Sequence, residues 1–270
     1  MKRVCLIALL LLFTIPTAVF SDDTPDVNSV AAVLMDAANG TILYSKNSQR
    51  EMAPASTTKI MTAILAIEKS DLNSVVTVSA NAAGKPETKM HLHKGEKIVL
   101  KDLLYGLLLS SGNDAATAIA EFISGSEDKF ARLMTQKAKE IGMKDTQFKN
   151  ASGLPAVNHY STAYDLAVLA RYALNNSTFA GIVQTKTASI ADERSKYNLT
   201  NHNKLLWQYE FATGIKTGYT QKAGNCLVAS ANREGINLIS VVLKSKSTYQ
   251  DSIKLFENGF SQLMSNSNNS

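Results

Sequence analysis

Strand-like runs near both ends of the chain, with helical patterns between them, constrain the fold most strongly. The segment SVAAVLMDAANGTILYSKN (29–47) consists of two apolar runs joined at Asn39-Gly40, a strong β-hairpin signal. Toward the other end, CLVASAN (226–232) and INLISVVLK (236–244) flank the turn residues REG as a second hairpin. We therefore predict an α+β fold, with one antiparallel sheet and a mostly helical insertion.

The central segments show the apolar spacing of amphipathic helices. A helix is expected to start just after Pro54, and Ser161 or Thr162 is expected to cap another. Residues 76–100 and 198–225 are turn-rich or mixed, and the first of these should contain short strands around a loop. No Pro- or Gly-rich linker separates the insertion from the sheet, so we expect the two parts to share one interface. The predicted helical segments are 56–69, three pieces within 101–142, 161–174 and 249–263.

The first 21 residues differ from the rest of the chain. Lys2 and Arg3 precede the apolar run VCLIALLLLFTIP, and the small residues of AVFS lead into an acidic segment. This pattern is typical of a secretory signal peptide, with cleavage expected after Ser21. A retained membrane anchor is the alternative, although the run is short for a spanning helix. Residues 22–270 would then form the mature catalytic domain, with no additional C-terminal β domain.

Export changes how the cysteines and charges are interpreted. Loss of the leader would leave Cys226 alone, which excludes an internal disulfide and favours a buried, small apolar side chain. The formal net charge would fall from +5 to +3 with the loss of Lys2 and Arg3. This mild positive charge suits work near an anionic envelope polymer and gives no argument for nucleic-acid binding.

Three short motifs contain residues that could perform chemistry. Ser56 and Lys59 are three positions apart on one helix face, so the lysine could take the proton of the serine hydroxyl if its pKa is lowered. Ser111-Gly112-Asn113 lies between two helical pieces; it is either a tight turn with Asn113 as N-cap, or a turn that directs a hydroxyl and a carboxamide into a cleft.

The third motif, Lys216-Thr217-Gly218, falls in a strand pattern. Taken alone, it is a strand that runs into a turn. As part of a site, an edge strand here could pair with an extended peptide, with Lys216 and Thr217 binding a terminal carboxylate. Each motif is weak alone, but their conjunction in this order in one exported chain is specific.

In these motifs the sequence resembles the low-molecular-mass penicillin-binding proteins, the serine D-Ala-D-Ala carboxypeptidases of bacterial cell-wall metabolism. The resemblance covers nearly all of residues 28–262 and includes the segments VLMDAANGTILYSKN, FKNASGLP, HYSTAYDLAVLARYAL, NHNKLLW and KAGNCLVASA. It implies the fold shared with β-lactamases: an antiparallel sheet of about five strands flanked by terminal helices, plus a mostly helical subdomain, with the active-site cleft between them.

The resemblance also implies roles for individual residues. Ser56 would be the acylated nucleophile and Lys59 its base, with a pKa lowered by burial and by Lys216 nearby. Ser111 would relay a proton to the leaving amine. The backbone amides of Ser56 and Tyr219 would form the oxyanion hole. Substrate-binding residues would be Asn113, Lys216, Thr217, Gly218 and Tyr219.

The implied function is removal of the terminal D-Ala from peptidoglycan stem peptides in the periplasm or another extracytoplasmic space. β-Lactams would be covalent inhibitors, no cofactor or metal is needed, and membrane association stays open. Three alternatives remain: a DD-endopeptidase or transpeptidase in the same site, a β-lactamase, and a non-catalytic wall-binding protein. A class A β-lactamase activates its deacylating water with a glutamate, and no Glu-x-x-Leu-Asn-like segment lies between Asn113 and Lys216.

Some residues are ambiguous. Tyr219 stands where relatives often carry histidine, and His202 stands where some carry a basic residue, so neither side chain receives a catalytic role. His91 and His93 lie in a charged loop without an obvious third metal ligand, and we expect a solvated loop there. His159 is expected to be structural. Asp165 either orients groups near Lys59 or is an exposed or capping residue. Lys244 and Lys246 either add positive charge for a substrate carboxylate or form a solvated strand end.

Overall fold

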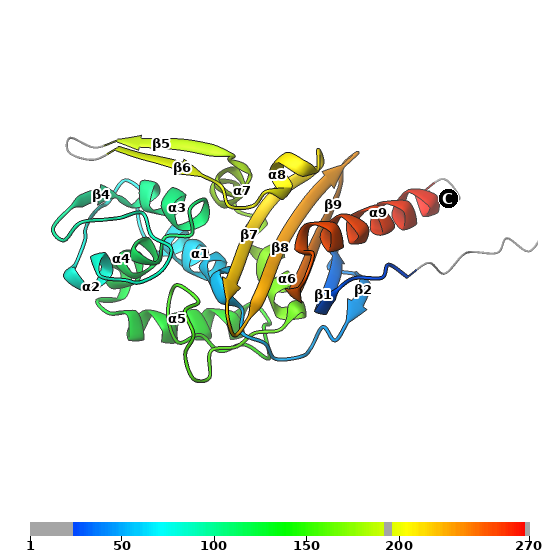
Figure 1. Ribbon diagram of the computed structural model, residues 1–270, viewed down its shortest axis with the longest axis horizontal. Helices are drawn as coiled ribbons and strands as arrows, with labels where there is room; N and C mark the ends of the chain where they lie inside the picture. Colours follow the sequence, from blue (N-terminus) through cyan, green and yellow to red (C-terminus); the bar gives the residue numbers. More distant parts are fainter. Residues whose placement is uncertain (1–23, 192–195, 268–270) are drawn as a thin grey trace, which may run out of the picture.

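The computed structural model describes residues 24–191 and 196–267. The predicted signal peptide and its cleavage position therefore lie outside the described residues. Within them, the predicted antiparallel sheet has five strands in the order β2-β1-β9-β8-β7, which brings the two hairpins of the sequence together (Figure 1). The strands are β1 (Ser29–Asp36), β2 (Ile42–Lys46), β7 (Ala212–Thr220), β8 (Gly224–Arg233) and β9 (Ile236–Ser245).

Strand β1 joins the two ends of the chain because it pairs with both β2 and β9. Its side chains alternate between the faces of the sheet: Val33 belongs to the apolar cluster on one face and Leu34 to the cluster on the other. Both side chains are fully buried. The near-continuous apolar run in this part of the sequence is thus explained by a central strand that is covered on both faces.

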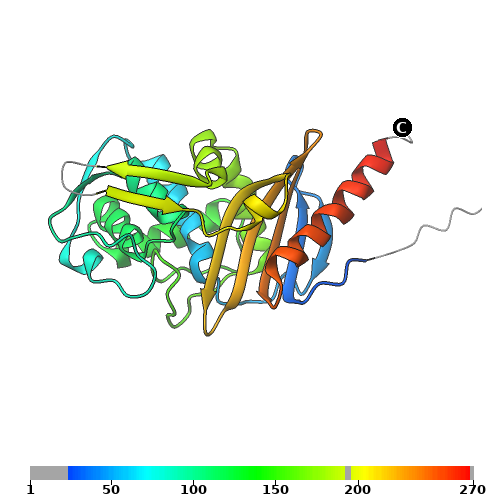
Figure 2. The same ribbon diagram turned by 45° about the horizontal axis from the view of Figure 1, so that its top comes forward.

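The terminal helix α9 (Thr248–Ser267) covers one face of the sheet (Figure 2). Phe256 and Phe260 of this helix are fully buried against Leu34 and Leu238 of the sheet cluster. This agrees with the prediction of an amphipathic closing helix. Among the described helices, none has the length and apolar character that crossing a membrane requires.

The opposite face of the sheet packs against the helical part of the molecule, and one apolar cluster runs through both. This confirms the expected shared interface. Ser126 caps α5 by accepting a hydrogen bond from the amide of Lys129, and Thr162, not Ser161, caps α6. The elements are α1 (Lys59–Lys69), β3 (Val75–Thr77), α2 (Ala80–Ala83), β4 (Lys97–Val99), α3 (Leu100–Leu108), α4 (Asn113–Ser124), α5 (Glu127–Glu140) and α6 (Ala163–Leu174).

Five elements were not predicted. The short helix α2 lies in the turn-rich segment 76–100, where only short strands around a loop were expected. Two of the others precede the mixed segment 198–225: helix α7 (Ser177–Gln184) and strand β5 (Thr187–Ala191). Strand β6 (Lys196–Thr200) pairs with β5 in a two-stranded sheet and overlaps the start of that segment. The short helix α8 (Leu205–Gln208) lies within it. Strands β5 and β6 alternate between exposed and partly buried side chains, with one buried residue each, Ile190 and Leu199. This weak apolar signal explains why their pairing was not evident in the sequence.

Candidate active site

The predicted nucleophile and base lie at the start of the central helix, but the local structure differs from the simple helix expected. Residues Ala55–Thr58 form a 3₁₀ turn, η1, which leads directly into α1 at Lys59. Because a 3₁₀ helix has three residues per turn, positions 56 and 59 are aligned one above the other. Lys59 Nζ consequently lies 2.9 Å from Ser56 Oγ.

Lys59 is fully buried and surrounded by acceptors. In addition to Ser56 Oγ, its Nζ lies 2.8 Å from Asn113 Oδ1 and 2.7 Å from the carbonyl oxygen of Ser152. Burial and the positive charge of Lys216 lower the pKa of Lys59 well below its usual value, as predicted. A neutral amine at this position would donate its two hydrogens to Asn113 and Ser152, which leaves its lone pair for the hydroxyl of Ser56.

The Ser-x-Asn motif connects α3 to α4. Ser111 has a φ of 61°, which non-glycine residues rarely adopt, and its side chain is nearly buried at the wall of the cavity. The prediction of Asn113 as N-cap was wrong, because Gly112 occupies that position. The Asn113 carboxamide instead contacts Lys59 and donates a 2.9 Å hydrogen bond to the carbonyl of Pro86. Its role toward a substrate amide stays a prediction.

The Lys-Thr-Gly motif lies on β7, the strand at one edge of the sheet. Gly218 is packed so closely that an added Cβ would lie 3.0 Å from the backbone nitrogen of Ser56 and 3.2 Å from the oxygen of Pro54. Any larger residue would push the strand away from the nucleophile. The amide of Ser56 thus lies beside the strand that carries Tyr219, the arrangement that the predicted oxyanion hole requires.

Lys216 is a second buried lysine, on the strand side of the site. Its side chain is 1% exposed, and its Nζ donates a 3.1 Å hydrogen bond to the carbonyl of Thr217. Burial lowers the pKa of Lys216 to about 7. The positive charge of this group is therefore easily lost or gained near neutral pH.

A cavity of about 480 Å³ opens between two sides of the site. We call the side that carries Ser56 and Ser111 the helical wall, and the side formed by Thr217 and Gly218 of β7 the strand wall. Of the predicted site residues, Lys59, Asn113 and Lys216 lie buried behind it. Cys226, which is buried beneath the cavity, keeps its proton because burial raises its pKa to about 11. This confirms the prediction of a small buried thiol. The predicted residues that line the cavity itself are Ser56, Ser111, Thr217, Gly218 and Tyr219.

His202 and Lys246 also line this cavity, whereas Lys244 does not. Partial burial, together with the positive charges of Lys216 and Lys59, lowers the pKa of His202. His91 and His93 are exposed, as expected, and no group of three or more His, Cys, Asp or Glu side chains in the described part of the chain could hold a metal ion.

Two other residues have structural roles. His159 was predicted to be structural, and it is buried and hydrogen-bonded within the fold. Its Nε2 lies 3.0 Å from Thr58 Oγ1, and its Nδ1 accepts a hydrogen bond from the amide of Lys149. Asp165 is also buried, which excludes the exposed role among those that the sequence left open. Its carboxylate accepts hydrogen bonds from the Asp145 amide and the Thr146 hydroxyl, and no hydrogen bond joins it to Lys59 in the described residues.

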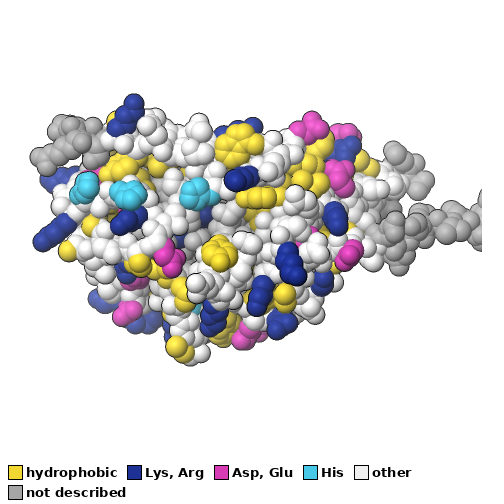
Figure 3. Space-filling view, in the orientation of Figure 1, with side chains coloured by type: hydrophobic (Ala, Val, Ile, Leu, Met, Phe, Trp, Pro, Cys, Tyr) yellow, Lys and Arg dark blue, Asp and Glu magenta, His cyan; other side chains and the backbone are white. Residues whose placement is uncertain are grey.

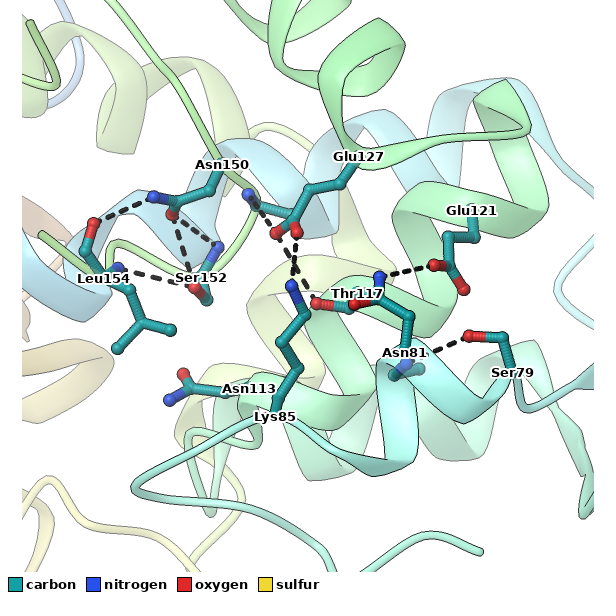
Figure 4. Close-up of polar contacts among 12 residues, drawn as sticks. Ser79, Asn81, Lys85, Asn113, Thr117, Glu121, Glu127, Asn150, Ser152 and Leu154 are labelled. Carbon is teal, nitrogen blue, oxygen red and sulfur yellow. Dashed lines mark hydrogen bonds and ion pairs between the residues drawn. The ribbon is translucent and has the colours of Figure 1, made fainter. Parts of the chain in front are cut away.

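The contribution of residues 150–154 to the site was missed. The carboxamide oxygen of Asn150 accepts hydrogen bonds from the amides of Ser152 and Gly153, and its nitrogen donates to the carbonyl of Leu154 (Figure 4). Glu127 accepts from the amide of Ala151 and pairs with Lys85 at 2.7 Å. This turn fixes the Ser152 carbonyl against Lys59. The only sequence signal was that this turn lies in the segment FKNASGLP.

Comparison with known proteins gives a consistent result. A family model described as D-alanyl-D-alanine carboxypeptidase matches residues 18–247. The chain is 40% identical over 256 residues to D-alanyl-D-alanine carboxypeptidase DacF of Bacillus subtilis, with 90% of this chain and 66% of that protein covered. It is 36% identical to D-alanyl-D-alanine carboxypeptidase of Streptomyces sp. strain K15, with 87% of this chain and 88% of that protein covered.

Solved structures agree with the sequence comparisons. The crystal structure of the Streptomyces K15 DD-transpeptidase superimposes with a TM-score of 0.83 at 32% sequence identity, over 88% of this chain and 98% of that one. The chain spans less of several other relatives: 66% of the length of DacF and 61% of DacD of Escherichia coli.

Proposed function

Because the chain belongs to the D-alanyl-D-alanine carboxypeptidase family of serine peptidases, we propose that it removes the terminal D-Ala from peptidoglycan stem peptides. The observation that carries the proposal is the 2.9 Å contact between Ser56 Oγ and the buried Nζ of Lys59, whose pKa is lowered. Few structural roles would require a fully buried lysine beside a serine that lines a cavity, because burial of an ammonium group is costly.

Acylation would begin with proton transfer. As Ser56 Oγ attacks the carbonyl carbon of the penultimate D-Ala, Lys59 takes the hydroxyl proton, and the carbonyl oxygen becomes an oxyanion between the amides of Ser56 and Tyr219. Collapse of this intermediate breaks the peptide bond. The leaving nitrogen of the terminal D-Ala receives the proton from Lys59 through the Ser111 hydroxyl, which leaves an ester on Ser56 and a neutral Lys59.

Deacylation would use the same groups in reverse. Water attacks the ester, Lys59 accepts a proton from it, and the Ser56 oxygen leaves and is reprotonated. The shortened peptide is thereby released with a new C-terminal carboxylate, and the Ser56 hydroxyl is regenerated. An amine in place of water would give transpeptidation. This is the second candidate, because the structurally similar Streptomyces K15 protein is a DD-transpeptidase. Hydrolysis of a cross-link, in which a longer branch leaves, is a further variant of the same chemistry.

The substrate's terminal carboxylate would be bound by Lys216 and Thr217 on the strand wall. β-Lactams would acylate Ser56 in the same way. We further propose that residues 22–270 form one exported catalytic domain, released by cleavage after Ser21 and located outside the cytoplasmic membrane. The mass of the mature protein from its native host tests the cleavage position.

Two measurements on the same protein test the proposal. Intact mass after a pulse of benzylpenicillin should show one covalent equivalent that persists, and this adduct should be absent from Ser56→Ala. Incubation with a peptide ending in D-Ala-D-Ala should release free D-Ala. An adduct that disappears within seconds while penicillin is consumed would indicate a β-lactamase, and the absence of both adduct and D-Ala release would indicate a binding protein. A peptide product joined to an added amine would favour transpeptidation.

A further inference from the structure

The active-site cavity contains one negatively charged side chain that the proposed reaction does not use. Glu87 lines the cavity on the helical side, together with Thr88 and Ser111, and its side chain is exposed. Among the lining residues that the structure describes, it is the only acidic one. Within 24–191 and 196–267, its carboxylate makes no ion pair and no hydrogen bond to another residue. Glu87 is therefore free to meet a ligand.

The backbone around Glu87 is fixed by the start of α4. The Asn113 carboxamide donates to the carbonyl of Pro86, and the Asn113 amide donates a 2.8 Å hydrogen bond to the carbonyl of Thr88, so both neighbours of Glu87 are held. Asp114 accepts from the amides of Met90 and Leu92 a little further along the loop. The same residues that form the site thus determine the position of Glu87.

Glu87 itself adopts a φ of 63°. This conformation costs a non-glycine residue roughly 1–3 kcal/mol and persists where the surroundings impose it, often at ligand-binding sites. The nearby Lys85 forms its ion pair with Glu127, at 2.7 Å, and not with Glu87. An unpaired carboxylate is therefore presented to the cavity from a constrained backbone.

The charges of the cavity are arranged on opposite walls. Lys216 lies behind the strand wall and Lys246 lines the cavity next to it, whereas Glu87 lies on the helical wall beside Asn113. The carboxylate is also near enough to Lys59 to oppose the lowering of its pKa. On the face shown in Figure 3, basic and acidic side chains are interspersed. Recognition on this face would thus depend on individual charges, without a broad field.

We propose that Glu87 forms a subsite for the ammonium group of the diamino acid that precedes D-Ala-D-Ala in a peptidoglycan stem. This inference rests on the proposed function and adds a preference to it. Peptidoglycan is cross-linked through amides between a D-Ala carbonyl and a side-chain amine, so a stem whose amine is not acylated carries one cation and one terminal carboxylate. The two walls match these two charges. Stems with a free amine are then preferred over stems in which that amine is acylated.

The test compares two peptides on the full mature enzyme: Nα-acetyl-L-Lys-D-Ala-D-Ala and its Nα,Nε-diacetyl counterpart, which lacks the ammonium group. At low ionic strength we expect kcat/KM to favour the charged peptide by about fivefold, the upper range for a solvent-accessible ion pair. Glu87→Gln should abolish this preference, and about 0.5 M salt should reduce it in the wild-type enzyme. Any effect of Glu87→Gln on the pKa of Lys59 changes kcat/KM for both peptides alike, so it cancels in the ratio of the two kcat/KM values.

Glu234→Gln is a matched control. Glu234 is also exposed and has a positive φ, 52°, but lies in the turn between β8 and β9. It should keep the preference of the wild-type enzyme. Equal turnover of the two peptides by the wild-type enzyme, or an equal loss for both in Glu87→Gln, would overturn the subsite. Equilibrium binding of both peptides to Ser56→Ala measures the same ratio without turnover. An inactive enzyme would thus reject the proposed reaction, while the binding ratio decides the subsite separately.

Discussion

The two walls of the cleft each bury a lysine, but the two lysines differ in how many hydrogen-bond partners surround the side-chain nitrogen. Lys59, on the helical wall, has three oxygen atoms within 2.9 Å of its Nζ. As a neutral amine it donates both of its hydrogens, to Asn113 and to the Ser152 carbonyl, and its lone pair is left for Ser56 Oγ. Lys216, on the strand wall, has one hydrogen-bond partner, the carbonyl of Thr217 at 3.1 Å. A lysine whose hydrogens are all used is held in place, whereas a lysine with unused hydrogens can bind an incoming oxygen. The comparison separates a candidate base from a candidate anion-binding group.

The support behind the two lysines differs as well. The helical wall depends on an irregular turn, in which Asn150 fixes the carbonyl of Ser152. The strand wall is part of a regular ladder, in which Lys216 pairs with Val228 of β8. Single side chains therefore position the base, whereas backbone pairing positions the anion-binding wall. Changes on the helical side should consequently affect the chemistry more selectively.

The largest effect is expected for Lys59→Met, which removes the candidate base and keeps a side chain of similar length. Acylation of Ser56 by benzylpenicillin should slow by about 10³-fold, within the usual range for loss of a general base. Stopped-flow acylation rates measure this, and thermal unfolding shows whether the variant is folded. Acylation within tenfold of the wild-type rate would mean that another group takes the proton.

Lys216→Met should reduce binding more than chemistry. Removal of a charge-assisted hydrogen bond costs about 2 kcal/mol, so kcat/KM for a D-Ala-D-Ala peptide should fall about 30-fold, mainly through KM. A peptide with a C-terminal amide lacks the carboxylate and should lose little. If kcat/KM falls equally for both peptides, Lys216 has a structural role. The assignment of anion binding to the strand wall would then be wrong.

The pH dependence of kcat/KM should report the ionisation of both lysines, Lys59 in the acid limb and Lys216 in the alkaline limb. Activity with the carboxylate peptide should decline above about pH 7, because the buried Lys216 loses its charge there. In Lys216→Met this alkaline decline should disappear. The acid limb should move to higher pH, because Lys59 no longer has a neighbouring cation and its pKa rises. An unchanged acid limb would show that the two lysines do not interact.

The smallest of these effects is expected for Asn150→Ala, which releases the turn that holds the Ser152 carbonyl. Acylation should slow by about tenfold, as expected for a loss of general-base positioning. The acid limb should shift to lower pH, because a carbonyl that accepts a hydrogen bond stabilises the ammonium form of Lys59. Asn150→Asp keeps the accepting oxygen and should retain more activity. A slower rate with an unmoved acid limb would indicate general destabilisation of the turn.

Much of this architecture could be predicted because local signals agree with it. The hairpin residues Asn39-Gly40 and the sequence REG mark turns, and Ser126 begins a helix as a cap should. The weakly apolar strands β5 and β6 and the 3₁₀ turn at Ala55–Thr58 had no comparable signal. Their conformation is imposed by neighbouring segments.

The sequence by itself determined the order of the three motifs and therefore the family and the chemical groups available. Only the tertiary structure decided how those groups are used: the burial that lowers the pKa of Lys59 and of Lys216, the contact of the Ser152 carbonyl with Lys59, and the unpaired Glu87 in the cavity. The physical reason is that pKa and hydrogen bonding depend on solvent exclusion and on neighbours that are distant in the chain. Ser56 and Ser152, for example, meet through a lysine although 96 residues separate them.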